Sequence, residues 1–372
     1  MNPLFVDWWL AHPSLFGMPF HLWTIFLVIL GTFVGSFLNV CIHRMPLDQS
    51  IVHPPSHCPH CRYAIPWYLN IPVVTWIWLW GRCRSCAAPI SPRYLAVEVL
   101  TATVFVVAWL VFGHNDPGTA LALCVLFALF IVATFIDFEH FIIPDQITIG
   151  GAVAGFVLSP LAPGLHATFS ATEALKRSAI GIAIGFGVVY GVVRLGKLLF
   201  GRERIPLEPG TRVVFHEDGI RLPDRDIPFG EIFYRESDTV RMVGQRVELA
   251  DRCYLHAEIR LSQKALVIGP DTFNPTDEPF LSAAATELVL PREAMGFGDV
   301  KFMATIGAFL GWKATVFTLG TASMMGAVLG LSLIAIGRRE WSSRLPFGPY
   351  LTAGALLWIF GGSRWWSRIF GG

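Results

Sequence analysis

The chain has 372 residues, of which 53% are hydrophobic and only 15% are charged. Soluble globular proteins carry about 25% charged residues, so this composition excludes an ordinary soluble protein and indicates a membrane protein. The net charge of +1 gives no reason to expect nucleic acid as a partner.

Eight apolar runs predict an α-helical polytopic membrane protein with about eight transmembrane helices. A helix needs about 20 residues to cross a bilayer, so the run at 300–311 is the shortest that we count as a span. The runs lie at 20–42, 94–112, 119–136, 147–162, 178–199, 300–311, 314–336 and 348–361.

The distribution of positive charge predicts the orientation of these helices. The first 19 residues contain no Lys or Arg, which favours an outside N-terminus followed by the first transmembrane helix, together 1–42. The four loops then placed in the cytoplasm hold more Arg than the outside loops, as the positive-inside rule requires. These loops are 43–93, 137–146, 200–299 and 337–347.

Two hydrophilic insertions interrupt the membrane runs. Residues 43–93 form a loop rich in Pro, Cys and Trp, and 202–292 hold twelve of the 28 Lys and Arg residues. Alternating apolar and polar residues in 212–222 and 246–269, with a hairpin signal at Asp218-Gly219, predict a small β-rich domain. The domain is inserted between 94–201, which hold helices 2 to 5 and the first of two aspartates discussed below, and 293–372, which hold helices 6 to 8. An insertion that leaves the flanking helices in register should have its two ends close together.

Four cysteines in the first loop have the spacing of a metal site. Cys58 and Cys61 form one C-x-x-C pair, and Cys83 and Cys86 form a second pair, separated from the first by 21 residues. Two such pairs complete a tetrahedral thiolate site for structural zinc. The alternative is two disulfides, which would require an oxidising compartment. The predicted cytoplasmic location favours zinc.

Two carboxylates lie where a membrane protein rarely tolerates them. Asp137 ends one apolar run, and Asp299 precedes another in the stretch Gly296-Phe297-Gly298-Asp299. Either acid alone could be an ordinary helix-end residue, and Asp145 after Pro144 is predicted as an N-cap. Together, at one membrane face, Asp137 and Asp299 could share a proton and activate water.

Glycines four residues apart occur in two predicted spans. Gly31 and Gly35 lie in the first, and Gly181 and Gly185 lie in the fifth. This spacing is typical of membrane helices whose backbones approach closely.

The chain resembles the prepilin peptidases of type IV pilus and type II secretion systems, which are membrane aspartic peptidases of the G-x-G-D class. The resemblance rests on the combination and order of several motifs. They are GSFLNVCIHRMP (35–46), the two C-x-x-C pairs, NIP (70–72), PRYLAVE (92–98), IDFEHFIIPD (136–145), GFGDVK (296–301) and PFGPY (346–350).

The resemblance implies removal of a basic leader from prepilins or pseudopilins after a glycine, at the cytoplasmic face of the bacterial inner membrane. It also implies N-methylation of the new N-terminal residue with S-adenosylmethionine. It makes Asp137 and Asp299 the catalytic pair, and it assigns zinc to Cys58, Cys61, Cys83 and Cys86.

Gly81 and Arg82 match a Gly-Lys pair that the family ties to methyl transfer. Arg82 departs from the lysine, and Leu69 replaces a glutamate usual before Asn70. A peptidase without methyltransferase activity is therefore one alternative. A proton-coupled transporter is another, because intramembrane carboxylates can relay protons, and a catalytically idle membrane scaffold is a third. The inserted domain is expected either to dock a partner or the prepilin, or to be a neutral graft.

Overall fold

The structure is a computed structural model that describes residues 19–216, 218–233, 238–249, 251–278, 280–291, 295–336 and 345–370. It divides into a helical unit, Met1–Val189 with Phe297–Gly372, and a β unit, Tyr190–Gly296. The predicted outside segment at the N-terminus and most of the predicted loop 337–347 lie outside the described residues.

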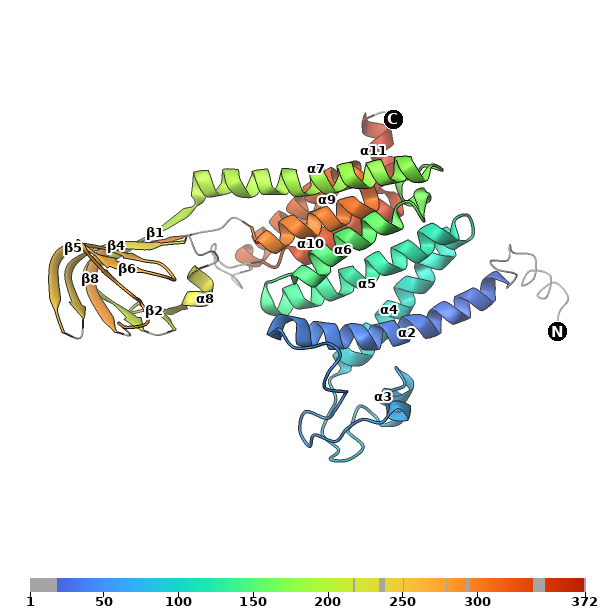
Figure 1. Cartoon of the computed structure of the whole chain (residues 1–372), viewed down its shortest axis with the longest axis horizontal. Helices are drawn as coiled ribbons and strands as arrows, with labels where there is room; N and C mark the ends of the chain where they lie inside the picture. Colours follow the sequence, from blue (N-terminus) through green and yellow to red (C-terminus); the bar gives the residue numbers. More distant parts are fainter. Residues whose placement is uncertain are drawn as a thin grey trace. The chain divides into compact units, whose positions relative to one another are not determined.

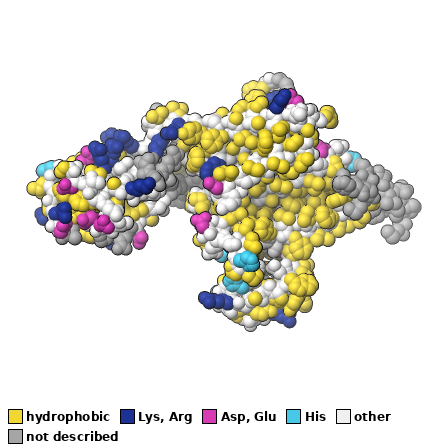
Figure 2. Space-filling view, in the orientation of Figure 1, with side chains coloured by type: hydrophobic (Ala, Val, Ile, Leu, Met, Phe, Trp, Pro, Cys, Tyr) yellow, Lys and Arg dark blue, Asp and Glu magenta, His cyan; other side chains and the backbone are white. Residues whose placement is uncertain are grey.

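Each of the eight predicted apolar runs forms helix (Figure 1). The helices are α2 (Phe20–Arg44), α4 (Pro92–Ala108), α5 (Pro117–His140), α6 (Asp145–Leu158), α7 (Ala171–Phe200), α9 (Phe297–Ala335) and α10 (Gly348–Leu357), followed by the short α11 (Ser363–Phe370). Turns of π-helix, Trp109–Gly113 and Trp358–Gly362, extend α4 and α10. Within the described residues, five helices are long and apolar enough to cross a membrane, so the chain is a polytopic membrane protein. Figure 2 shows the hydrophobic side chains that cover this unit.

The chain reverses direction inside α9, at Gly311. This residue has a left-handed backbone (φ 78°, ψ 176°) that breaks the helix. A Cβ atom placed on Gly307 would lie 3.0 Å from Cγ2 of Thr315, eight residues further along. Eight residues of continuous helix would rise about 12 Å, so 297–310 and 312–335 are two separate helices packed side by side. They correspond to the predicted runs 300–311 and 314–336.

Glycines bring helix backbones into contact, as the sequence predicts. A Cβ atom on Gly31 would lie 2.6 Å from the Cα atom of Ala102, and one on Gly35 would lie 2.6 Å from that of Glu98, both in α4. A Cβ atom on Gly181 would lie 2.0 Å from the carbonyl oxygen of Gly307. No side chain fits at these three crossings, because backbone occupies the space. The prediction of close helix packing is confirmed.

The four-cysteine module, which we define as residues 45–91, connects α2 to α4. It contains few regular elements: 3-10 helices at Met45–Leu47 and Trp67–Leu69, the short helix α3 (Val74–Trp78) and two isolated β-bridges. The backbone N–H of Val73 donates to Oε2 of Glu98 in α4 at 2.7 Å, which fixes the start of α3 to the helical unit.

The described residues of the β unit form an antiparallel sheet of eight strands in the order β3-β2-β1-β8-β4-β5-β6-β7. Its strands are β1 (Arg202–His216), β2 (Gly219–Arg221), β3 (Asp226–Pro228), β4 (Val240–Leu249), β5 (Cys253–Leu261), β6 (Leu266–Ile268), β7 (Asp271–Phe273) and β8 (Leu281–Pro291). A short helix, α8 (Phe229–Ile232), follows β3. Alternate side chains of the central strands form one apolar core, which confirms the predicted β pattern.

Strand pairing in the β unit confirms two further predictions. His216 lies opposite Gly219, so the chain turns at the predicted hairpin. Arg202 pairs with Pro291, so the first strand of the insertion begins beside the end of its last strand. The two ends of the insertion are therefore close together in space, although about 90 residues separate them in the chain.

Candidate active site

Asp137 is buried near the C-terminal end of α5, with 4% of its surface exposed. Phe141 adopts a left-handed conformation (φ 55°) that ends the helix, and its N–H donates to the carbonyl oxygen of Asp137. The carboxylate oxygen Oδ2 of Asp137 accepts a hydrogen bond at 2.7 Å from the backbone N–H of Gly348. The start of α10 thus supplies a donor to a carboxylate at the end of α5.

Gly348 leaves room for this contact because it has no side chain. A Cβ atom there would lie 2.9 Å from Oδ2 of Asp137 and 3.2 Å from Cδ1 of Ile143. The N–H groups in the first turn of a helix have no partner within the helix and carry its positive dipole end. They therefore favour a carboxylate at this position.

Asp299 lies in the first turn of α9 and is also buried, with 8% of its surface exposed. The preceding Gly298 packs on Ile143, whose backbone nitrogen lies 3.3 Å from the position of a Cβ atom on that glycine. Ile143 also contacts Gly348. Ile143 thus packs against the start of α9 and against the start of α10. The N–H group at the start of α10 is the one that donates to Asp137. The two predicted aspartates therefore belong to neighbouring helix ends.

The structure corrects the expectation for Asp145. The sequence predicts an N-cap, but Pro144 occupies the cap and Asp145 is the first residue of α6, with no side-chain bond to the helix start. Its Oδ1 instead accepts from Nζ of Lys301 at 2.6 Å. Lys301 is in the same motif as Asp299, so this ion pair ties the start of α6 to the start of α9.

The four-cysteine module joins the helical unit at this same end. Arg93, in the first turn of α4, forms an ion pair with Glu139, two residues beyond Asp137. Sequence reasoning missed this contact and the bond from Gly348. The motif PFGPY was noticed only as a point of resemblance, and no local pattern shows which carboxylate its backbone reaches.

The four cysteines form a metal-binding geometry. All four Sγ atoms lie within 4.8 Å of one another, and the Sγ···Sγ distances are 3.8 Å for Cys58 with Cys86 and 3.9 Å for Cys61 with Cys83. A tetrahedral zinc with Zn–S bonds of about 2.3 Å would place its sulfur ligands about 3.8 Å apart. A disulfide would need a distance of about 2.05 Å. The residues fit zinc, and the free thiols do not fit the disulfide alternative.

The two C-x-x-C pairs have the same backbone geometry. In each, the residue before the first cysteine forms a β-bridge to the other side of its loop: His57 with Ala64, and Arg82 with Pro89. The backbone N–H groups of Cys61 and Tyr63 lower the pKa of Cys58 and of Cys61, respectively. Lower pKa values favour the thiolate that a metal requires at these two positions, whereas burial and the neighbouring cysteine side chains raise the pKa of Cys86 to about 11.

Gly81 and Arg82, the predicted methyl-transfer residues, lie beside the third cysteine. Gly81 has a left-handed backbone (φ 64°), and a Cβ atom there would lie 2.7 Å from the ring of Trp76. Arg82 is exposed. Neither residue lines the cavities of about 490 Å³ and 720 Å³ in the β unit and the helical unit.

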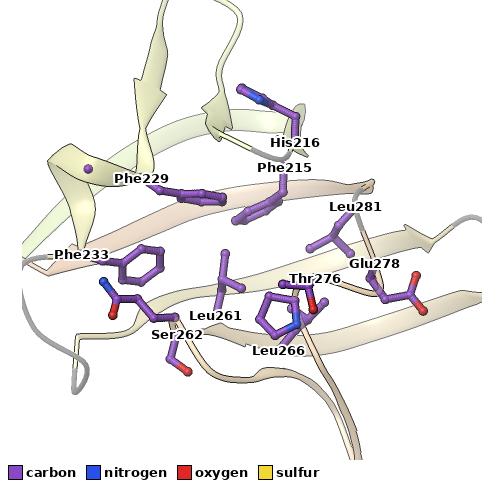
Figure 3. Close-up of a pocket in the computed structure, with 13 residues that line it drawn as sticks. Phe215, His216, Phe229, Phe233, Leu261, Ser262, Leu266, Thr276, Glu278 and Leu281 are labelled. Carbon is purple, nitrogen blue, oxygen red and sulfur yellow. The ribbon is translucent and has the colours of Figure 1, made fainter.

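One cavity of about 490 Å³ lies in the β unit (Figure 3). Its wall carries aromatic and aliphatic side chains from α8 and from the ends of β1 and β5, including Phe215, Phe229, Phe233 and Leu261, with Glu278 at its edge. A second cavity, of about 720 Å³, lies in the helical unit around His166 and Gly311. Neither cavity is lined by a predicted site residue.

Comparisons with known proteins identify related sequences. Residues 29–112 match the Bacterial Peptidase A24 N-terminal domain, and residues 124–205 and 271–331 match the Type IV leader peptidase family. A Myxococcus xanthus protein named prepilin leader peptidase/N-methyltransferase is 32% identical over 88% of this chain and 69% of its own length. A protein of the same name from Aeromonas hydrophila is 28% identical over 97% of this chain and 98% of its own. No solved structure matches.

The two matched segments of the Type IV leader peptidase family contain Asp137 and Asp299, and the interruption between them falls inside the β unit. The similarity to the Myxococcus xanthus protein covers most of both chains. The chain therefore belongs to the type IV leader peptidase family of bacteria.

Proposed function

We propose that this membrane protein removes the leader peptide from prepilins or pseudopilins and methylates the new N-terminus, with Asp137 and Asp299 as its catalytic pair. Membership of the family and the names of its relatives support the activity. The assignment of Asp137 and Asp299 as the catalytic pair rests on one observation, which is that three helix ends lie close together near Ile143. These are the end of α5 with Asp137, the start of α9 with Asp299 and the start of α10.

Two buried carboxylic acids can hydrolyse a peptide bond without a metal. One of the pair, ionised, takes a proton from water, and the other, protonated, donates a hydrogen bond to the scissile carbonyl. The N–H of Gly348 occupies one oxygen of Asp137 and fixes the orientation of its carboxylate. Because such acids titrate as a pair, we assign neither role to one residue.

Cys58, Cys61, Cys83 and Cys86 would hold zinc as a structural ion. Four protein ligands leave no open position for water or substrate, so zinc would stabilise the module rather than take part in hydrolysis. S-adenosylmethionine, when bound, supplies the methyl group, and Gly81 and Arg82 are proposed to lie near it.

The topology we propose has eight membrane crossings, with the active site at the cytoplasmic face of the bacterial inner membrane. The reversal at Gly311 supports counting α9 as two helices. The arginines in 43–93 and 337–347 support a cytoplasmic placement of these two loops, and with eight crossings the ends that carry Asp137 and Asp299 lie on the same side.

Co-expression with a candidate prepilin tests this function. Mass spectrometry of the mature pilin should show a shortened chain whose N-terminus carries one methyl group. Cleavage without methylation would establish the peptidase alone, as the departures at Leu69 and Arg82 allow. A full-length prepilin after co-expression with each of several candidate substrates would contradict the proposal.

The β unit is proposed to dock a partner or the prepilin and to contribute no catalytic group. Its two ends lie side by side, so 203–291 can be replaced by a short Gly/Ser linker without separating the flanking helices. The shortened protein should still cleave a prepilin peptide in detergent. If it binds zinc and yet cannot cleave, the β unit belongs to the catalytic machinery.

A further inference from the structure

The four-cysteine module exposes an unusual number of large apolar side chains. Trp67, Trp78 and Trp80 have exposed fractions of 82%, 68% and 85%. Four more exposed apolar residues lie in the same short segment: Tyr68, Ile71, Val74 and Ile77. We call these seven residues the tryptophan face. Single exposed apolar residues are normal on a protein surface, but seven within the segment 67–80 mark an interaction surface.

The local fold explains why these side chains point away from the module. In α3, Ile77 and Trp78 lie three and four positions after Val74, so these three side chains share one side of the helix. Thr75 is buried, and the ring of Trp76 packs on Gly81. The interior of the module thus uses Thr75 and Trp76 and leaves the other side of α3 uncovered.

The exposed arginines of the module suit an anionic surface. Asp48 is the only carboxylate between residues 45 and 91, which contain no lysine. Arg62, Arg82 and Arg84 are all exposed. These arginines are exposed cations, although the whole module is close to neutral once the dianionic group of a zinc ion and four thiolates is included.

The position of the module in the chain indicates that lipid is the partner of the tryptophan face. The module starts where α2 ends and stops where α4 begins, and both helices are long and apolar enough to cross a membrane. Figure 1 shows the module beside these two helices. A surface tethered at both ends to membrane helices meets lipid at a high effective concentration at all times, whereas a protein partner would have to displace that lipid.

We propose that the tryptophan face inserts into the interfacial layer of the bilayer that holds α2 and α4, with Arg62 and Arg84 at the lipid phosphates. Tryptophan concentrates at this depth because its ring is apolar and its N–H needs a polar partner. Clustered basic residues add attraction to anionic headgroups. The contact with lipid would hold the zinc site at a fixed depth beside the end of the helical unit that carries Asp137.

Tryptophan fluorescence in lipid nanodiscs tests the proposal with the full-length, zinc-loaded protein. The probe is phosphatidylcholine brominated either near the ester end or near the middle of its acyl chains, because bromine quenches tryptophan on contact. Subtracting the emission of the triple variant Trp67→Ser/Trp78→Ser/Trp80→Ser isolates the three side chains. We expect the difference emission to be blue-shifted and quenched more by the shallow bromines than by the deep ones.

The same measurement identifies other occupants. Emission at the wavelength of water-exposed tryptophan, quenched by aqueous acrylamide and by neither brominated lipid, would overturn the proposal. The proposal would also be overturned if the three tryptophans were protected from acrylamide only in discs that hold two copies of the chain, since the partner would then be a second copy. Added phosphatidylglycerol should increase the shallow quenching in the wild type and should not do so in Arg62→Gln/Arg84→Gln. An equal increase of shallow quenching in both proteins would show that these arginines do not bind the lipid phosphates.

Zinc content is the control for folding, because the substituted side chains are exposed and the variant should keep its metal. If the triple variant loses zinc, the wild-type protein supplies a second measurement. In discs that contain a photoactivatable phosphatidylcholine, mass spectrometry should then place lipid adducts on residues 67–80. Adducts confined to the transmembrane helices would overturn the proposal.

Discussion

The backbone N–H of Gly348 donates a hydrogen bond of 2.7 Å to Oδ2 of Asp137, 211 residues earlier in the chain. The contact places the first turn of α10 against the end of α5. It requires glycine, since a Cβ atom would lie 2.9 Å from the same carboxylate oxygen. The PFGPY segment is thereby part of the environment of the proposed active site.

Gly348→Ala should lower prepilin cleavage by at least roughly tenfold, because its methyl group displaces the carboxylate of Asp137 and small errors of position are costly in catalysis. The measurement is the initial rate of leader removal in detergent. Gly361→Ala is the matched control, because Gly361 lies further along the same helical segment and a Cβ atom there meets nothing within 4 Å. Equal rates for the two variants would contradict this role of Gly348.

Asp137→Asn and Asp299→Asn should each abolish leader cleavage while the protein remains folded, because asparagine keeps the shape of the side chain and cannot exchange the proton. Immunoblotting of co-expressed prepilin measures the ratio of precursor to mature protein. Near-normal processing by either variant would rule out the pair.

Asp145→Asn should retain most of the activity. Asp145 pairs with Lys301, but its side chain is 59% exposed, and an ion pair this open contributes about 1 kcal/mol or less. The rate of prepilin cleavage measures the effect. A loss as large as that of Asp137→Asn would move the catalytic assignment from Asp137 to Asp145.

Purified protein should contain one zinc ion per chain by elemental analysis. Cys58→Ser should remove the metal and unfold the module, because metal binding supplies much of the folding free energy of a small zinc domain. Cys253→Ser is the control, since Cys253 lies in the β unit and outside the cluster. Wild-type protein free of stoichiometric metal would reject the zinc assignment.

Gly181→Ala should destabilise the helical unit by roughly 1–3 kcal/mol, a typical cost of overpacking. Its methyl group would lie 2.0 Å from the carbonyl oxygen of Gly307, so α7 and α9 must separate. Gly187→Ala lies in the same helix with nothing within 4 Å and should be neutral or stabilising, because alanine favours helix more than glycine does. Thermal unfolding in detergent compares the two, and a similar loss in both variants would contradict this account.

The stability of the helical unit should fall as pH decreases below about 6.5, because of His166. This residue lies in the connection between α6 and α7, and burial, with a smaller effect of the Arg177 charge, lowers its pKa to about 4. The unfolded chain therefore binds a proton at a pH where the folded protein does not, and the stability lost between pH 8 and pH 5 should be about 2 kcal/mol.

Thermal unfolding at pH 8 and pH 5 measures this loss. His166→Gln should reduce the difference between the two pH values, whereas the exposed His256→Asn should not. A pH dependence unchanged in His166→Gln would show that another group is responsible.

The sequence alone determined the membrane class, the helical runs and the four-cysteine cluster. These features depend on composition and on residues close together in the chain, where apolar length and the C-x-x-C spacing predict the outcome directly. The alternating pattern of 212–222 and 246–269 likewise predicted strands in the β unit.

Only the tertiary structure decided the partners of the residues around the proposed active site. Asp145 illustrates the difference: its position after proline suggested a cap, but a lysine 156 residues later provided a charged partner. The bond from Gly348 to Asp137 and the ion pair of Arg93 with Glu139 are equally invisible to local patterns. They depend on which helix ends pack together, and close backbone contacts at glycines such as Gly31 and Gly181 determine that packing.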